Sequence, residues 1–199
     1  MGASERDEWS RAAWRALIGR EVDARRLVFV DECGTHTSLA PLYAWARLGE
    51  RAHAQAPRNR GKNTTLLASM TAEGMGPCMA VVGSTTTAVF EAYVEQVLAP
   101  ALRPGQIVVM DNLAAHKGER VRELVEGSGC GLSYLPPYSP DLNPIEEAFS
   151  KVKISLRRAG ARTREALVEA MGRALDAVTP QDARGFFKHC GYGLRGQSL

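Results

Sequence analysis

Two short apolar runs, each followed directly by an aspartate, constrain this sequence most. Leu27–Val30 precedes Asp31, and Ile107–Met110 precedes Asp111. Such runs are typical of buried β-strands, and in open α/β sheets ligands and chemistry gather outside the carboxyl ends of the strands. If the two strands are neighbours, the carboxylates repel each other unless a cation lies between them, and hard oxygen ligands favour Mg²⁺ or Mn²⁺. The alternative is that each aspartate only ends a strand and starts a turn.

The other apolar segments predict a mixed α/β sheet. Further strands are expected at residues 43–48, 64–70, 78–82 and 132–135, and helices at 10–19, 85–98, 119–125, 144–158, 163–178 and 180–189. A strand–helix–strand crossover pairs its strands in parallel, whereas the opening strands are close enough in sequence to pair antiparallel. We therefore expect a sheet of about five strands with helices on both faces. Trp45, in the strand expected at residues 43–48, is expected in the core.

A rigid loop precedes the first of the three C-terminal helices. Residues 136–144 contain four prolines, each of which fixes its φ angle. Asn143 is expected to cap the helix, with Pro144 at the first helical position.

Glu146 has two interpretations. Its spacing from Asn143 is that of a capping box, in which the glutamate binds the backbone of the cap residue. Alternatively, it is a functional acid, because it shares one row of the helix with Lys153 and Arg157 and lies off the apolar stripe. Glu147 is expected to form an ordinary surface pair with Lys151. We therefore favour Glu146 as the third acid.

These residues carry a family resemblance. Thirty-four residues separate Asp111 from Glu146, and the segment Tyr134–Glu146 (YLPPYSPDLNPIE) resembles the third-acid region of DDE transposases, most closely the bacterial insertion-sequence branch of the mariner-related superfamily. Phe29–Glu32 resembles the first-acid strand of that family. Val108–Asn112, followed by His116 and Lys117, resembles the second. The basic stretch at residues 58–63 and the segment 189–192 also match, so the resemblance covers roughly residues 27–193.

The resemblance implies an RNase H-like fold in which Asp31, Asp111 and Glu146 bind two Mg²⁺ or Mn²⁺ ions. The reaction it implies is cleavage of transposon ends and transfer of their 3′-hydroxyls into target DNA, at TA sites. No covalent protein–DNA intermediate is required, since the attacking group is a water or a DNA hydroxyl. A homodimer on DNA is the expected assembly.

Several weaker candidates surround these acids. Asn112 and His116 follow the second acid, and His116 is expected either to orient a group near the ions or to be an ordinary loop histidine. Five basic residues are candidates for DNA contacts, although a basic run is equally often a solvated surface. They are Arg58, Arg60, Lys62, Lys153 and Arg157.

Composition limits the remaining choices. The net charge of +3 does not by itself argue for nucleic acid. The four cysteines are isolated from one another, which disfavours a zinc site and favours reduced thiols. No apolar run approaches the roughly 18 residues of a membrane helix, and the N-terminus lacks a signal-peptide core. We expect a cytoplasmic, nucleoid-associated protein.

The expected organisation is an extension at residues 1–26, a catalytic domain at 27–193 and a tail at 194–199. The family normally carries helix-turn-helix modules ahead of its catalytic domain, so an upstream-frame portion joined by frameshifting is one expectation and a truncated relic is another. Two alternative functions stay open. One is an RNase H-like nuclease without a role in transposition, and the other is a non-catalytic regulator of a full-length transposase.

Overall fold

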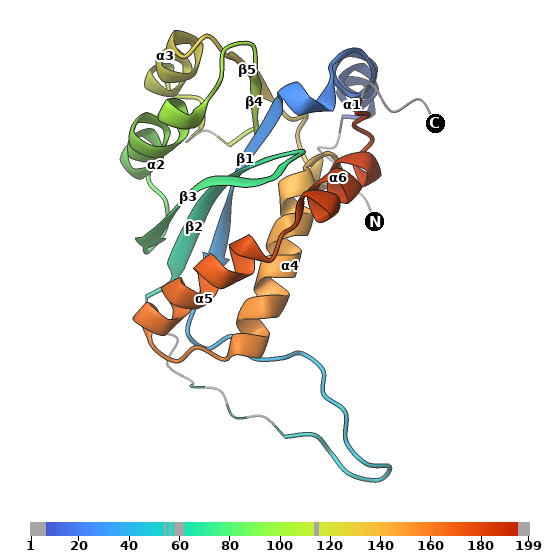
Figure 1. Cartoon of the computed structure of the whole chain (residues 1–199), viewed down its shortest axis with the longest axis vertical. Helices are drawn as coiled ribbons and strands as arrows, with labels where there is room; N and C mark the ends of the chain where they lie inside the picture. Colours follow the sequence, from blue (N-terminus) through green and yellow to red (C-terminus); the bar gives the residue numbers. More distant parts are fainter. Residues whose placement is uncertain (1–6, 54, 56, 58–61, 114–115, 195–199) are drawn as a thin grey trace.

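The computed structural model describes residues 7–53, 55, 57, 62–113 and 116–194. Its centre is a five-stranded sheet in the order β3-β2-β1-β4-β5 (Figure 1). The strands are β1 (Leu27–Thr35), β2 (Thr64–Thr71), β3 (Gly74–Val82), β4 (Ile107–Met110) and β5 (Gly131–Tyr134). β1, β2 and β3 pair antiparallel, whereas β4 pairs in parallel with both β1 and β5. The mixed sheet expected from the sequence is therefore confirmed.

Helices cover both faces of this sheet (Figure 1). They are α1 (Glu8–Trp14), α2 (Thr87–Tyr93), α3 (Glu119–Gly127), α4 (Pro144–Ala159), α5 (Arg164–Asp176) and α6 (Pro180–His189). Side chains of β1 alternate between two cores, because successive residues of a strand point to opposite faces. Phe29 packs in the core of α4, α5 and α6, and Val30 packs in the core of α2 and α3.

β1 is longer than its apolar run, and this changes the setting of Asp31. The parallel pairing with β4 ends at Val30 and Met110, but the antiparallel pairing with β2 continues to Thr35 and Thr64. Asp31 therefore lies inside β1 rather than at its end. It is nevertheless the first residue beyond the parallel pairing, at the same level as Asp111.

The prediction of a strand at residues 43–48 is wrong. β1 pairs with β2 down to the pair of Thr35 and Thr64, so the hairpin is closed without the intervening segment. None of the described residues of that segment joins the sheet, and Figure 1 shows it projecting as a long loop. Trp45 is fully exposed on this loop and is not a core residue.

The N-terminal residues pack on the main core. The helix expected at 10–19 is present as α1, which continues as a π-helical turn at Arg15–Arg20. Trp14 is 8% exposed and belongs to the core of α4, α5 and α6. The domain boundary at residue 26 stays a prediction. Trp14, which precedes that boundary, packs in the core of the predicted catalytic domain. Within the described residues no helix is long and apolar enough to span a membrane.

Candidate active site

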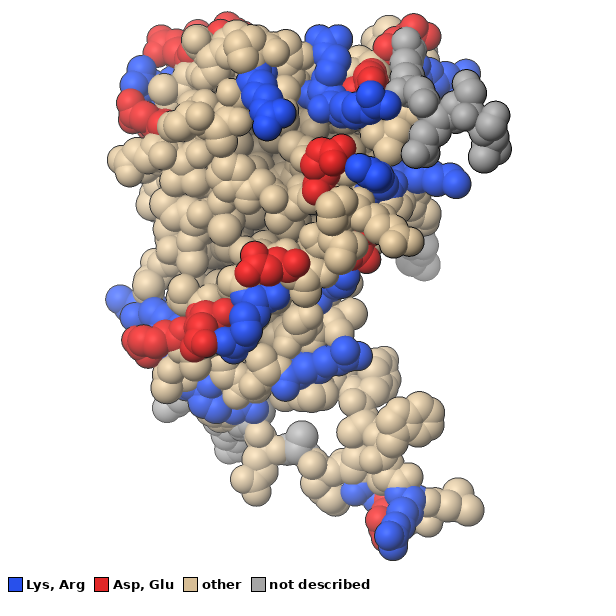
Figure 2. All heavy atoms as spheres, in the orientation of Figure 1, with Lys and Arg blue, Asp and Glu red and all other residues tan. Residues whose placement is uncertain are grey.

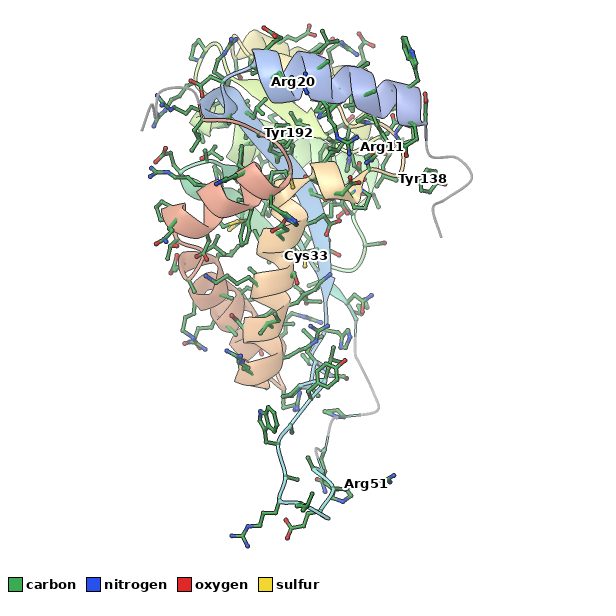
Figure 3. All side chains as sticks on the ribbon, turned by 90° about the vertical axis from the view of Figure 1, so that its right-hand side faces the viewer. Arg11, Arg20, Cys33, Arg51, Tyr138 and Tyr192 are labelled. Atoms are coloured by element: carbon green, nitrogen blue, oxygen red, sulfur yellow. The ribbon has the colours of Figure 1, made fainter. Side chains whose placement is uncertain are left out.

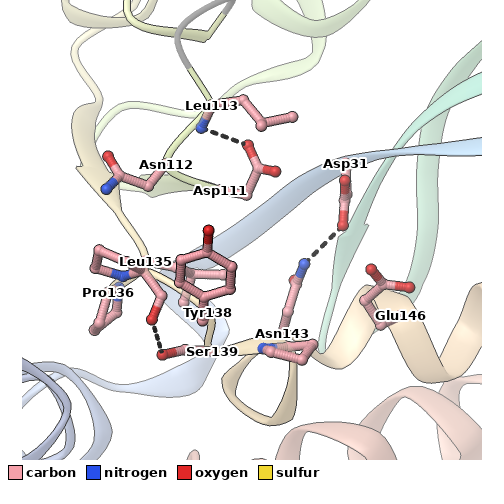
Figure 4. Close-up of a pocket in the computed structure, with 12 residues that line it drawn as sticks. Asp31, Asp111, Asn112, Leu113, Leu135, Pro136, Tyr138, Ser139, Asn143 and Glu146 are labelled. Atoms are coloured by element: carbon pink, nitrogen blue, oxygen red, sulfur yellow. Dashed lines mark hydrogen bonds between the residues drawn. The ribbon is translucent and has the colours of Figure 1, made fainter. Parts of the chain in front are cut away.

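One cavity of about 410 Å³ collects the three predicted acids (Figure 4). Asp31 comes from β1, Asp111 follows β4, and Glu146 lies in the first turn of α4. The remaining lining comes from Asn112, Leu113, Asn143 and the segment 135–140. The fold thus brings to one place three carboxylates that are up to 115 positions apart in the sequence.

Asp31 is the most deeply placed of the acids, with 7% of its surface exposed. Its Oδ1 accepts a hydrogen bond of 2.7 Å from the backbone N–H of Glu32. Burial, together with the negative charges of Glu146 and Asp111, raises the pKa of Asp31 to about 7 against the opposing effects of that hydrogen bond and of His116. A carboxyl group in this state is stabilised as an anion by any cation that enters the cavity.

His116 connects the second acid to a fourth carboxylate. Its Nδ1 lies 2.5 Å from Asp111 Oδ1, and its Nε2 lies 3.2 Å from Glu32 Oε1. The imidazole is fully buried and stacks on Phe90 with ring centroids 4.1 Å apart. Burial opposes protonation, but the contacts with Asp111 and Glu32 outweigh it and raise the pKa of His116 to about 9. Sequence reasoning missed Glu32, whose only signal was its place beside Asp31.

Asn143 differs from the expectation. It stands at the N-cap of α4, but its side chain makes no capping bond there, so the capping-box interpretation of Glu146 is wrong. Asn143 Nδ2 instead donates a hydrogen bond of 2.8 Å to Asp31 Oδ2 (Figure 4). The physical reason is that Asp31 is buried and needs a donor, whereas Pro144 leaves the first turn of α4 with one fewer N–H to cap. Glu146 is left exposed to the cavity.

The predicted basic residues are placed unequally. Burial raises the pKa of the Cys33 thiol, two positions along β1 from Asp31, to about 11, and Lys153 lies close enough to oppose that rise. Arg157 is half-buried one turn further along α4. Lys62 is exposed two residues before β2 and is not among the residues that line the cavity. Arg58 and Arg60 lie outside the described residues.

Charged side chains of both signs cover α4 and α5. On the face drawn in Figure 2, Lys and Arg lie beside Asp and Glu over the lower part of these helices and at the tip of the long loop.

The expected pair of Glu147 with Lys151 does not form. Glu147 Oε1 lies 2.5 Å from His189 Nδ1, and Lys151 Nζ lies 2.6 Å from Asp182 Oδ2. Both side chains pair with residues of α6, which packs against α4.

The donor set at the cavity fits divalent cations. Three carboxylates share it, and the buried Oδ1 of Asn143 has no hydrogen-bond partner among the described residues. The described residues contain no ready-made cluster of three or more His, Cys, Asp or Glu side chains around one point. Carboxylates that repel one another are expected to stand apart around a common space until a cation draws them together. Hard oxygen donors of this kind suit Mg²⁺ and Mn²⁺.

Comparisons with known proteins agree with this geometry. The sequence pattern of the DDE superfamily endonucleases matches residues 26–168, which is more than two thirds of the chain. The chain belongs to the DDE superfamily of endonucleases. A comparison with curated protein sequences finds no match.

Solved structures of the Mos1 mariner transposase share the fold. The isolated Mos1 catalytic domain aligns with a TM-score of 0.65 at 16% identity, over 96% of this chain and 91% of that one. The Mos1 paired-end complex with the left transposon end gives a TM-score of 0.71 at 19% identity, over 94% and 58%. The paired-end complex with Mn gives 0.68 at 20% identity, over 94% and 59%. This chain therefore spans less than two thirds of the transposase chains in those complexes. The RNase H-like fold expected from the resemblance is confirmed.

Proposed function

We propose that this chain is the catalytic domain of a DDE transposase, in which Asp31, Asp111 and Glu146 hold two divalent ions, Mg²⁺ or Mn²⁺. One observation carries the proposal: acids from β1, β4 and α4 line a single cavity, and the pKa of Asp31 is raised to about 7 there by burial and by its acidic neighbours. A Mos1 paired-end complex that shares the fold was solved with Mn. Held by these three acids, two divalent ions would supply activation of an attacking hydroxyl and stabilisation of the leaving oxygen in an in-line phosphoryl transfer.

The other residues of the site hold the acids and the DNA. His116 fixes the orientation of Asp111 through its 2.5 Å contact. Asn143 donates a hydrogen bond to Asp31 and so fixes the position of that carboxylate at the cavity. Lys153 and Arg157 lie along α4 from Glu146, where they can contact the phosphates of a strand that enters the cavity. Asn112 lines the cavity beside the second acid.

The proposed partners are transposon ends and target DNA, with insertion at TA dinucleotides, which deform readily. We propose a homodimer on DNA, for which the Mos1 paired-end and strand-transfer complexes offer a parallel. The long loop after β1 supports this assembly, because four large apolar side chains on it are more than two thirds exposed. Exposed apolar patches of this kind mark sites of contact with another protein chain. They are Leu42, Tyr43, Trp45 and Leu48.

We also propose that the protein acts in the cytoplasm, at the nucleoid. Recognition of the transposon ends is proposed to come from a helix-turn-helix portion. The proposal for a recognition portion is consistent with this chain spanning 58% of the Mos1 chain in its paired-end complex. Without such a portion, binding by this chain is governed by phosphate contacts, which carry little sequence preference.

The test is nicking of supercoiled plasmid by the purified chain with Mg²⁺ or Mn²⁺, beside Asp111→Asn. Nicking that requires the metal and disappears in the variant supports the proposal. If the folded chain nicks equally well after Asp111→Asn, the assignment of the acids is wrong. If it neither nicks nor binds Mn²⁺, a non-catalytic regulator becomes the better explanation.

A further inference from the structure

An ion pair between a buried arginine and a half-exposed aspartate joins α1 to the loop that precedes α4. The guanidinium of Arg11 is fully buried, and its two terminal nitrogens lie 3.0 and 2.6 Å from the two carboxylate oxygens of Asp141. Arg15, one turn further along the helix, lies 3.4 Å from the same carboxylate. A bidentate arginine–carboxylate pair fixes the relative orientation of its partners as well as their distance.

A second connection runs parallel to the first. Trp14 Nε1 donates a hydrogen bond of 2.9 Å to the hydroxyl of Tyr192, and that hydroxyl donates one of 2.6 Å to the backbone oxygen of Leu142. Both bonds are buried. Figure 3 shows Arg11 and Tyr192 on the same side of α1, toward the loop that carries Tyr138. Asp141 and Leu142, which are adjacent in the loop, are thus both connected to α1. Asp141 is bonded to Arg11 directly, and Leu142 is bonded to Trp14 through Tyr192.

These two loop residues come immediately before the active-site elements. Asn143, which donates to Asp31, is the next residue, and Glu146 follows within the first turn of α4. Residues 141–143 have little conformational freedom, because the prolines on either side of them, Pro140 and Pro144, have fixed φ angles. A displacement at Asp141 and Leu142 is therefore passed on to Asn143 and Glu146.

We infer that α1 is a brace for the active-site loop, and that Arg11 and Tyr192 are positioning residues for Glu146. Arg11 holds Asp141, and Tyr192 holds Leu142. Neither touches the cavity: Glu146 receives their effect through Asn143 and the start of α4. This inference rests on the proposed function only in taking Glu146 as a catalytic acid.

The test is hydrogen exchange by mass spectrometry on the metal-free chain carrying Arg11→Met. Methionine keeps most of the buried volume and removes the ion pair. The amides of Leu142, Asn143 and Glu146, which donate to Ser139, Pro140 and Asn143, report on the loop. We expect these amides to exchange about tenfold faster or more, the change that loss of a charged hydrogen bond produces, with β1 and β2 unchanged.

Arg184→Met is the matched control. It removes an ion pair of α6 with Glu73, 3.2 Å long and exposed, that does not involve the loop. Arg184→Met should leave exchange in residues 139–147 at the wild-type rate. A folded Arg11→Met chain whose loop also exchanges at the wild-type rate overturns the inference.

Tyr192→Phe decides the matter if Arg11→Met fails to fold. It removes only the hydroxyl that joins Trp14 to Leu142, so the ring contacts of Tyr192 with Phe29 remain. Faster exchange at Leu142 supports the brace, and unchanged exchange overturns it.

Titration with Mn²⁺ separates this inference from the proposed function. A wild-type chain that binds no Mn²⁺ contradicts the proposed function but leaves the exchange result valid for the brace. If the wild type binds Mn²⁺ and Arg11→Met binds it at least about tenfold more weakly, the change has at least the size expected for loss of a charged hydrogen bond, and the brace positions Glu146 as inferred. Equal affinity of the folded variant overturns the positioning role.

Discussion

The side-chain amide of Asn143 lies 2.8 Å from Asp31 and joins the start of α4 to the middle of β1. This bond connects the segment that carries the third acid directly to the first acid. It also supplies a neutral donor to a buried carboxylate that is surrounded by other acids. The distance between the first and third acids is therefore set by Asn143 and by the helix geometry that follows it.

Replacement of Asn143 by alanine should destabilise the chain. It removes the donor from a buried carboxylate, and an unsatisfied buried polar group costs about 1–3 kcal/mol. Urea unfolding at neutral pH measures this difference. Ser150→Ala, at an exposed position of α4, is the control and should be nearly neutral. If the two variants have the same free energy of unfolding, the bond between Asn143 and Asp31 contributes nothing.

His116→Phe should reduce metal-dependent nicking while the chain stays folded. The phenyl ring keeps the stacking on Phe90, but the contacts with Asp111 and Glu32 are lost. Partners that orient a metal ligand typically account for about 10–100-fold in metal affinity or activity. The measurement is the nicking rate against Mn²⁺ concentration, with thermal unfolding to verify the fold. An unchanged metal dependence in a folded variant would rule out an orienting role for His116.

Lys153 and Arg157 should contribute phosphate contacts. Each Lys or Arg that neutralises a phosphate adds about one unit to the slope of log affinity against log salt. The double variant Lys153→Ala with Arg157→Ala should therefore bind a DNA duplex more weakly, with a slope lower by about two. Fluorescence anisotropy across a salt series measures this. Lys188→Ala, exposed on α6, is the matched control. A slope equal to that of the control would place these two residues off the DNA path.

Asp182 gives a pH-dependent stability that is separate from the site. Hydrogen bonds from Lys151 and from Thr179 lower the pKa of Asp182 from 3.8 to about 2. A depressed folded-state pKa contributes stability that is complete above the unfolded value and is lost as the pH falls through the folded value. Asp182→Asn should therefore lower the Tm at neutral pH, and its difference from wild type should shrink between about pH 3.8 and pH 2. A difference that is constant with pH would show that the charge of Asp182 is unimportant.

Local patterns predicted the sheet and most helices. The apolar run Ile107–Met110 coincides with β4, and the Asn143-Pro144 signal coincides with the start of α4. These elements are determined by a few adjacent residues, so short-range reasoning is sufficient. The segment at 43–48 misled because its composition suits a strand, whereas the pairing of Thr35 with Thr64 leaves it no place in the sheet.

The acids of the site were predictable, but the groups that hold them were not. Asp31 and Asp111 are marked by the apolar runs that they follow, and Glu146 is marked by a proline-rich motif. The bonds from Asn143 to Asp31 and from Arg11 to Asp141 join residues 112 and 130 positions apart. Such pairs depend on the folded arrangement of several elements, and neither partner carries a local signal of the other. Glu147 and Lys151 show the same limit, since α6 offers both of them nearer partners than each other.

Titration of the chain with Mn²⁺, followed by electron paramagnetic resonance, is the most direct test of the three acids as metal ligands. We expect about two bound ions per chain, with binding weakened or lost in Asp31→Asn, Asp111→Asn and Glu146→Gln. Glu147→Gln, one residue away but directed at His189, should bind Mn²⁺ like the wild type. Binding that survives in all three acid variants, or is lost equally in Glu147→Gln, would contradict the assignment of this cavity as the metal-dependent active site.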